Sequence, residues 1–279
     1  MPDEPKMLLD GLVFPEGPRW HNGKLWFSDM RGYRVMTVDV SGASAVVADL
    51  PNMPSGLGWL PDGRLVAVSM HDRQLLMLGE HGMETYADLS GVATGDCNDM
   101  VIDGRGRAYV GNFGAEIDGA RQPANIALVE NGAVRVVAEG LMFPNGAVIT
   151  PDGGTFIVAE TLANRLSAFD IAGDGSLSNR RVFAELGAAT PDGVCLDAEG
   201  AVWVSSFFTN EFLRVKEGGE VRDRIEVPGK MAIACALGGA SRTTLFLLTA
   251  TGTLEDMYAS RTRGFIETVE VAVPGAGWP

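Results

Sequence analysis

The chain has 279 residues, of which 46% are hydrophobic, and it carries a formal net charge of −14 at neutral pH. This charge repels phosphate backbones and anionic lipids, so we expect neither a nucleic acid nor a membrane surface as a partner. No apolar run reaches the roughly 20 residues of a membrane span, and residues 1–11 lack the basic and apolar pattern of a signal peptide.

A six-residue phrase recurs six times along the chain, at intervals of 39 to 47 residues. Such a period is typical of folds built from repeated units. In most copies an Asn-Gly or Asp-Gly turn and a second apolar run follow, which is the pattern of a β-hairpin. In chain order the phrases are PEGPRW at 15–20, PSGLGW at 54–59, CNDMVI at 97–102, PNGAVI at 144–149, PDGVCL at 191–196 and MAIACA at 231–236.

The second apolar runs are short and nearly continuous, as in LWFSD at 25–29 and TFIVAE at 155–160, which indicates strands covered on both faces. The rest of each repeat supplies two further strands. The sequence therefore predicts an all-β fold, a six-bladed β-propeller with four antiparallel strands per blade, as a single domain over 1–279. Residues 7–14 and 268–275 are predicted to share one blade, so that the two termini close the ring. The longest irregular connection, 114–125, has the length of a binding loop.

The second position of the phrase varies where a purely structural repeat should be constant. In a propeller the innermost strands line the central channel, so these six positions should meet at one end of it. Carboxylates and amides gathered there repel one another and are costly to bury, and a hard divalent cation with oxygen ligands resolves both problems. Capping of strand ends is the alternative for any single copy. The six residues are Glu16, Ser55, Asn98, Asn145, Asp192 and Ala232.

Taken in order, these motifs resemble the family of senescence marker protein, gluconolactonase and luciferin-regenerating enzyme nearly from end to end. The resemblance implies a six-bladed propeller that binds one divalent metal and commonly hydrolyses lactones. It implies Glu16, Asn145 and Asp192 as the metal ligands, with Asn98 beside the metal in contact with substrate or water. Calcium is the leading candidate ion, and zinc, magnesium and manganese are the alternatives. The matching segments are PEGPRWHNGKLWFSD, NDMVIDGRGRAYVGNFG, PNGAVITPDGGTFIVAET, PDGVCLDAEGAVWVSSF, and CALGG followed by LFLLTA.

One departure bears on the substrate. Sugar-lactonase members of the family often carry Arg two residues before the Asn that corresponds to Asn98, and this chain has Asp96 there. The sequence therefore favours a hydrophobic or aromatic lactone. Apolar and aromatic residues at the ends of the second strands and in the following loops are predicted to bind it, together with one histidine. These substrate-binding candidates are Met30, Met70, His71, Phe113, Phe207 and Phe208.

In the predicted mechanism the metal polarises the ester carbonyl and Asp192 is the catalytic residue, a general base that takes a proton from water. A hydroxide on the metal is the competing nucleophile. Asn98 orients water or substrate, while Asp99 is expected to face the other way along its strand, in a structural role. No GxSxG elbow is present to indicate a serine hydrolase.

Several other functions remain open: a sugar-acid lactonase like gluconolactonase, a phosphotriesterase-like hydrolase, a non-catalytic ligand-binding propeller, and a propeller whose metal only stabilises the fold. The expected partner is a small-molecule lactone or ester, and the expected assembly is a monomer or homodimer. Cys97, Cys195 and Cys235 form an odd set without CxxC spacing, which predicts a reducing, cytoplasmic location.

Overall fold

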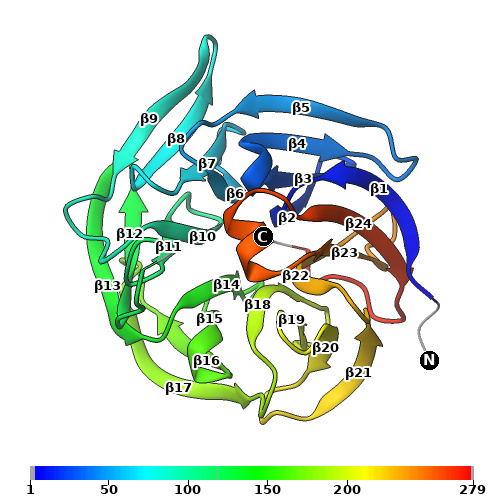
Figure 1. Cartoon of the computed structure of the whole chain (residues 1–279). Coiled ribbons are helices and arrows are strands. Elements are labelled where there is room, and N and C mark those ends of the chain that lie inside the picture. The colour runs from blue at the N-terminus through cyan, green and yellow to red at the C-terminus, as the bar shows by residue number, and fades with distance from the viewer. Residues whose placement is uncertain (1–3, 118, 278–279) are drawn as a thin grey trace.

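The computed structural model describes residues 4–117 and 119–277, and nearly all of its regular structure is β-strand. The strands form six four-stranded antiparallel sheets arranged as blades around a central axis (Figure 1). This is the six-bladed β-propeller that the repeat predicts.

Within each blade the chain runs from the axis outwards, so that the first strand is innermost. Blades one to five follow this order, and in blade six the outermost strand comes from the start of the chain. Blade one consists of β2 (Pro15–His21), β3 (Lys24–Asp29), β4 (Arg34–Val38) and β5 (Ser44–Asp49). Blade two consists of β6 (Pro54–Trp59), β7 (Leu65–Ser69), β8 (Gln74–Gly79) and β9 (Gly82–Asp88). Blade three consists of β10 (Cys97–Ile102), β11 (Ala108–Asn112), β12 (Ala124–Glu130) and β13 (Ala133–Leu141).

The last blade closes the ring in the predicted way, because β1 from the start of the chain pairs antiparallel with β24 from its end. Lys6 lies opposite Thr268 in this pairing.

Blade four consists of β14 (Pro144–Ile149), β15 (Thr155–Glu160), β16 (Arg165–Ile171) and β17 (Leu177–Glu185). Blade five consists of β18 (Pro191–Leu196), β19 (Val202–Ser206), β20 (Glu211–Val215) and β21 (Val221–Glu226). Blade six consists of β22 (Met231–Gly238), β23 (Thr244–Thr251), β24 (Arg263–Glu270) and β1 (Lys6–Leu12).

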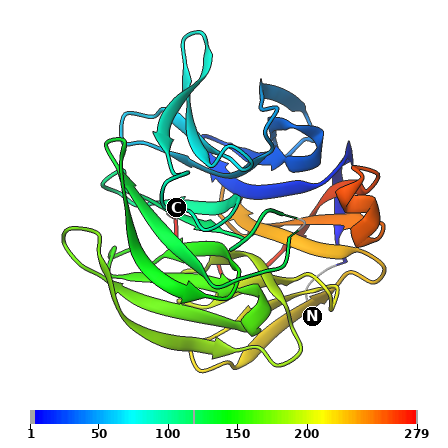
Figure 2. The ribbon, with the colours of Figure 1, turned by 60° about the vertical axis from the view of Figure 1, so that its left-hand side comes forward.

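Three short helical segments interrupt the strands. They are η1 (Met30–Gly32), η2 (Thr161–Ala163) and α1 (Leu254–Tyr258). The sequence analysis predicted no helix, but α1 begins at a capping box in which Thr253 and Asp256 bond each other's backbone N–H groups. α1 lies beside the ends of the innermost strands, on one side of the ring (Figures 1 and 2). Within residues 4–117 and 119–277, no helix has both the length and the apolar character needed to cross a membrane.

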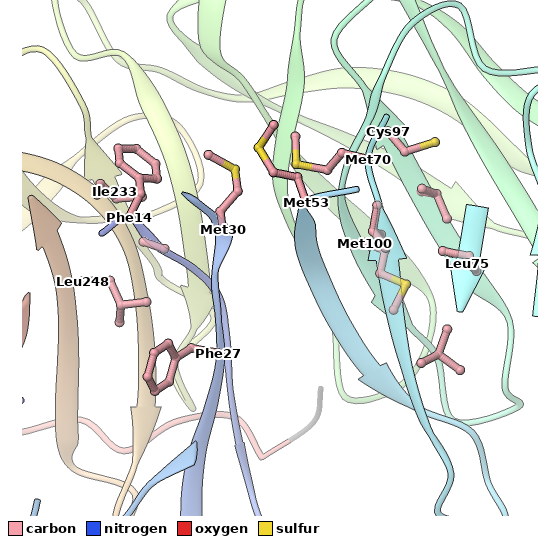
Figure 3. Close-up of a cluster of buried hydrophobic side chains, with 14 of the residues drawn as sticks. Phe14, Phe27, Met30, Met53, Met70, Leu75, Cys97, Met100, Ile233 and Leu248 are labelled. Carbon is pink, nitrogen blue, oxygen red and sulfur yellow. The ribbon is translucent and has the colours of Figure 1, made fainter. Parts of the chain in front are cut away.

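Apolar side chains fill the space between neighbouring blades. Figure 3 shows part of this core, with Phe14, Phe27 and Met30 on one side and Met53 and Met70 on the other. All five are buried. Packing between blades, rather than within one sheet, therefore sets the orientation of each innermost strand.

The innermost strands approach one another closely because glycine follows the variable position in four of them. A Cβ on Gly17, Gly56, Gly146 or Gly193 would lie 2.3–2.6 Å from an atom of the next blade. In all six innermost strands the pairing register also shifts directly after the variable position, which marks a bulge there. The glycines and bulges together let the six strands begin around one axis.

We predict that Gly56→Ala destabilises the protein by about 1–3 kcal/mol, because its Cβ would lie 2.3 Å from the Met100 backbone nitrogen. Urea unfolding measures this. The control is Gly104→Ala, where nothing lies within 4 Å of the added Cβ, and it should change stability by less than about 0.5 kcal/mol. Equal stabilities for the two variants would contradict the close-approach argument.

Candidate metal and substrate site

A cavity of about 230 Å³ lies at the end of the axis where the innermost strands begin. Four of the six variable positions line it: Glu16 of β2, Asn98 of β10, Asn145 of β14 and Asp192 of β18. Each of these side chains is at least nine-tenths buried. The structure therefore brings together the four polar residues on which the sequence prediction depends, although they come from four different blades.

A chain of hydrogen bonds fixes the two amides. The Ser55 hydroxyl donates to Asn98 Oδ1 over 3.3 Å, and Asn98 Nδ2 donates to Asn145 Oδ1 over 3.0 Å. Asn145 Nδ2 in turn donates to Thr161 Oγ1 over 3.2 Å, and the Thr161 hydroxyl donates to the Pro191 carbonyl. Because its amide nitrogen is held by Thr161, Asn145 is oriented with its oxygen on the side of Asn98.

The two carboxyl groups lack comparable support. Glu16 accepts one hydrogen bond, from the Gly17 N–H, and Asp192 Oδ1 is buried without a hydrogen-bond partner among the described residues. Burial raises the pKa of Glu16 well above its ordinary value, and the negative charges of Asp192 and Asp99 raise it further. Burial, and then Asp99, likewise raise the pKa of Asp192, while a hydrogen bond from the Asn145 side chain acts in the opposite direction. Two carboxyls held in this way repel each other and are poorly solvated.

Asp99 is buried close to the site but does not line the cavity. The register shift between Cys97 and Met100 marks a bulge at this point of β10. The Asp99 carboxyl raises the pKa of both Glu16 and Asp192, and its Oδ1 has no hydrogen-bond partner in the described chain. The structural role expected for Asp99 therefore stays a prediction.

These groups fit a hard cation. In the part of the chain that the structure describes, no three His, Cys, Asp or Glu side chains are gathered into a metal-binding group, so the amide oxygen of Asn145 is the side-chain donor that would add to the two carboxylates. Buried carboxylate and amide oxygens, one of them unpartnered, are the donors that calcium and magnesium prefer. Zinc is less well suited, because no His or Cys lines the cavity.

The walls of the cavity are mainly apolar. Four of the predicted substrate-binding residues lie there, namely Met30, Phe113, Phe207 and Phe208, and Phe208 is exposed at the rim. The sequence analysis missed several others. Phe14 and Phe143 each directly precede a repeat phrase, and this shared position could have indicated them. The capping box could have indicated the three residues of α1. The missed lining residues are Phe14, Ile117, Arg121, Phe143, Thr161, Leu162, Leu254, Met257 and Tyr258.

The structure does not bring Met70 and His71 to this cavity. Met70 is fully buried in the core, where its N–H donates to the Met53 carbonyl (Figure 3). His71 Nδ1 lies 2.9 Å from Asp96 Oδ2. Asp96 occupies the position where the resemblance implies Arg, and it is itself buried and absent from the cavity lining. Met70 and His71 are therefore replaced as candidates by residues of α1 and of the 113–123 connection.

The chain is thus a six-bladed β-propeller with buried oxygen donors under a mainly apolar cavity at one end of its axis. Comparison with known families makes this more specific. The family described as "SMP-30/Gluconolactonase/LRE-like region" matches residues 14–251. The chain belongs to this family.

Individual relatives agree with that placement. The chain is 25% identical over 276 residues to 6-deoxy-6-sulfogluconolactonase of Pseudomonas putida, covering 96% of this chain and 94% of the relative. It is 25% identical to lactonase drp35 of Staphylococcus haemolyticus, over 80% of this chain and 70% of that one. The solved structure of a luciferin-regenerating enzyme superposes with a TM-score of 0.85 at 18% identity, covering 99% of this chain and 97% of the other, which confirms the fold.

We predict that the cation-free protein loses stability as the pH rises. The folded state holds a proton on Glu16 above the pH at which the unfolded chain releases it, so rising pH favours the unfolded state. Glu16→Gln removes this penalty and should raise the melting temperature of chelator-treated protein by about 2–4 °C at pH 8, with a smaller gain at pH 5.

Scanning calorimetry from pH 5 to 8 makes the measurement, with exposed Glu80→Gln as the control. A Glu16→Gln protein that is less stable than the parent at pH 8 without a cation would contradict this electrostatic description of the site.

Proposed function

We propose that this protein is a divalent-metal-dependent hydrolase that opens lactones. The observation that carries the proposal is the gathering of Glu16, Asn98, Asn145 and Asp192 at one end of the axis, with a buried carboxylate oxygen left unpartnered. Two relatives named as lactonases, one of them matched along nearly the whole chain, support the reaction class.

Glu16, Asn145 and Asp192 would hold the cation. When bound, a divalent cation polarises an ester carbonyl and offsets the negative charge that develops on its oxygen. Calcium is the first candidate because all the donors are oxygen atoms. Asn98 holds the Asn145 amide in place through its Nδ2, and this leaves it a second amide hydrogen with which to orient the substrate carbonyl or the water.

Asp192 is the proposed general base. It accepts a proton from the water that attacks the lactone carbonyl, and the ring-opened product leaves as a hydroxy acid. Burial raises the pKa of Asp192 above its ordinary value in the cation-free protein, whereas a bound cation would favour the carboxylate form that can accept the proton. The apolar walls exclude other water molecules from the reacting carbonyl.

A sugar-acid lactone is the leading substrate class. The relative that matches nearly the whole chain is named 6-deoxy-6-sulfogluconolactonase, and the family description includes gluconolactonase. The comparisons thus favour the sugar-acid alternative over the hydrophobic or aromatic lactone that the sequence analysis placed first.

An aromatic lactone is the second candidate, because the cavity itself favours it. Phe113 and Phe143 form one tilted pair with ring centroids 4.6 Å apart, and Phe207 and Phe208 form another at 4.9 Å. These rings offer stacking surface to a planar substrate and no hydrogen bonds to the hydroxyl groups of a sugar.

We predict that Asp192→Asn lowers kcat by about 10²- to 10⁴-fold, the range for loss of a general base. Asp152→Asn is the matched control, because it changes the same Pro-Asp-Gly tripeptide at an exposed turn and should retain full activity. Hydrolysis is followed with a pH indicator on glucono-δ-lactone and on dihydrocoumarin, an aromatic lactone. An Asp192→Asn protein with parental kcat would eliminate this mechanism.

We also expect chelation to abolish hydrolysis and one cation to restore it, when calcium, magnesium, manganese and zinc are added back separately. Faster turnover of glucono-δ-lactone than of dihydrocoumarin would support the sugar-acid class, and the reverse would support the aromatic one. Full activity in protein from which elemental analysis finds every divalent metal removed would end the metal-dependent proposal.

A further inference from the structure

The connection between β11 and β12 forms one wall of the cavity. Phe113, Ile117 and Arg121 from this connection line the cavity. The Arg121 guanidinium carbon lies 4.7 Å from the centre of the Phe113 ring and 5.0 Å from that of Phe143, at cation–π distance. Arg121 also donates to the backbone carbonyls of Glu116 and Ile117. This wall has to be held in place if the cavity is to keep one shape.

Asp96 makes the contacts that hold the first half of this wall. Its Oδ2 accepts hydrogen bonds from the Ile117 N–H over 3.0 Å and from His71 Nδ1 over 2.9 Å. Its own N–H donates to the Ala115 carbonyl, and its carbonyl accepts from the Phe113 N–H. One buried residue thus contacts three positions between 113 and 117.

The backbone around Asp96 is fitted closely to the same segment. A Cβ on the preceding Gly95 would lie 2.2 Å from the nitrogen and oxygen of Ala115, so only glycine allows this approach. His71 contacts Asp96 from the second blade, and its N–H donates to the Asn52 carbonyl. The contact therefore ties the wall of blade three to the neighbouring blade.

We propose that Asp96 and His71 form a clamp that fixes residues 113–117 as a wall of the cavity, and that Asp96 is thereby a positioning residue for substrate selection. The effect on substrate selection rests on the proposed lactone hydrolysis, whereas the effect on the wall does not. Asp96 does not line the cavity. It acts through Phe113 and Ile117, which do.

The test compares Asp96→Ala, Asp96→Asn and His71→Ala in the metal-loaded protein. The alanine variant loses both side-chain hydrogen bonds, whereas the amide oxygen of asparagine can accept both. We expect Asp96→Ala to raise KM for the better lactone about tenfold, the cost of ordering wall side chains on binding, with kcat changed less than about twofold because the groups of the metal site are untouched. Asp96→Asn should restore KM to within about twofold of the parent.

His71→Ala removes one of the two bonds and should raise KM by about threefold. Because His71 is partly exposed, this variant keeps the proposal testable if Asp96→Ala does not fold. His81→Ala, at an exposed turn between β8 and β9, is the matched control and should leave KM unchanged.

Amide hydrogen exchange of residues 113–117 supplies a readout that needs no substrate. Faster exchange there in Asp96→Ala, and not in Asp96→Asn, supports the clamp. This holds even if the parent protein hydrolyses no lactone, because the absence of hydrolysis would refute only the proposed function. Unchanged exchange in Asp96→Ala refutes the clamp, whether or not the parent hydrolyses lactones, and an unchanged KM in a parent that hydrolyses them refutes its effect on substrate selection. The clamp is also refuted if the Ala and Asn variants show the same changes in kcat, KM and melting temperature.

Discussion

The site depends on like charges that the fold holds together away from water. Glu16 and Asp192 belong to the first and fifth blades, yet they lie at the same end of the axis. The nearby carboxyl of Asp99 raises the pKa of both. Burial raises the pKa of all three. Arg19 offsets part of this charge, because it lowers the pKa of Glu16 and of Asp99. The proposed divalent cation would offset the rest, where the cation-free protein has to retain a proton.

The propeller produces this arrangement because its innermost strands begin close together around the axis. Its innermost strands can begin side by side because Gly17, Gly56, Gly146 and Gly193 leave no room for a side chain between adjacent blades. Since the variable position directly precedes these glycines, its side chains converge on the axis. The repeat thus provides the fold, and the second position of the phrase provides the polar side chains on which the proposed chemistry rests.

The propeller fold and the polar residues at the axis could be predicted from the sequence because both follow the repeat. The repeat places Glu16, Asn145 and Asp192 at equivalent points, and the pairing of β1 with β24 follows from the spare strands at the two ends. Part of the walls could also be predicted, because Met30, Phe113 and Phe207 follow second strands of the repeat. Ile117, Arg121 and the residues of α1 could not, because they come from connections outside the repeat. Met70 was misplaced because it continues an apolar strand into the core.

The aromatic walls of the cavity favour an aromatic lactone, whereas the names of the relatives favour a sugar-acid lactone. This question concerns the connections that form the walls and not the polar residues at the axis. The most direct test of the central claim concerns these polar residues. It is a calorimetric titration of chelator-treated protein with calcium, magnesium, manganese and zinc. We expect one ion to bind per chain, with proton release on binding, and binding to be lost in the Glu16→Gln, Asp192→Asn double variant. No binding of any of the four ions at millimolar concentration, or undiminished binding in the double variant, would contradict the account.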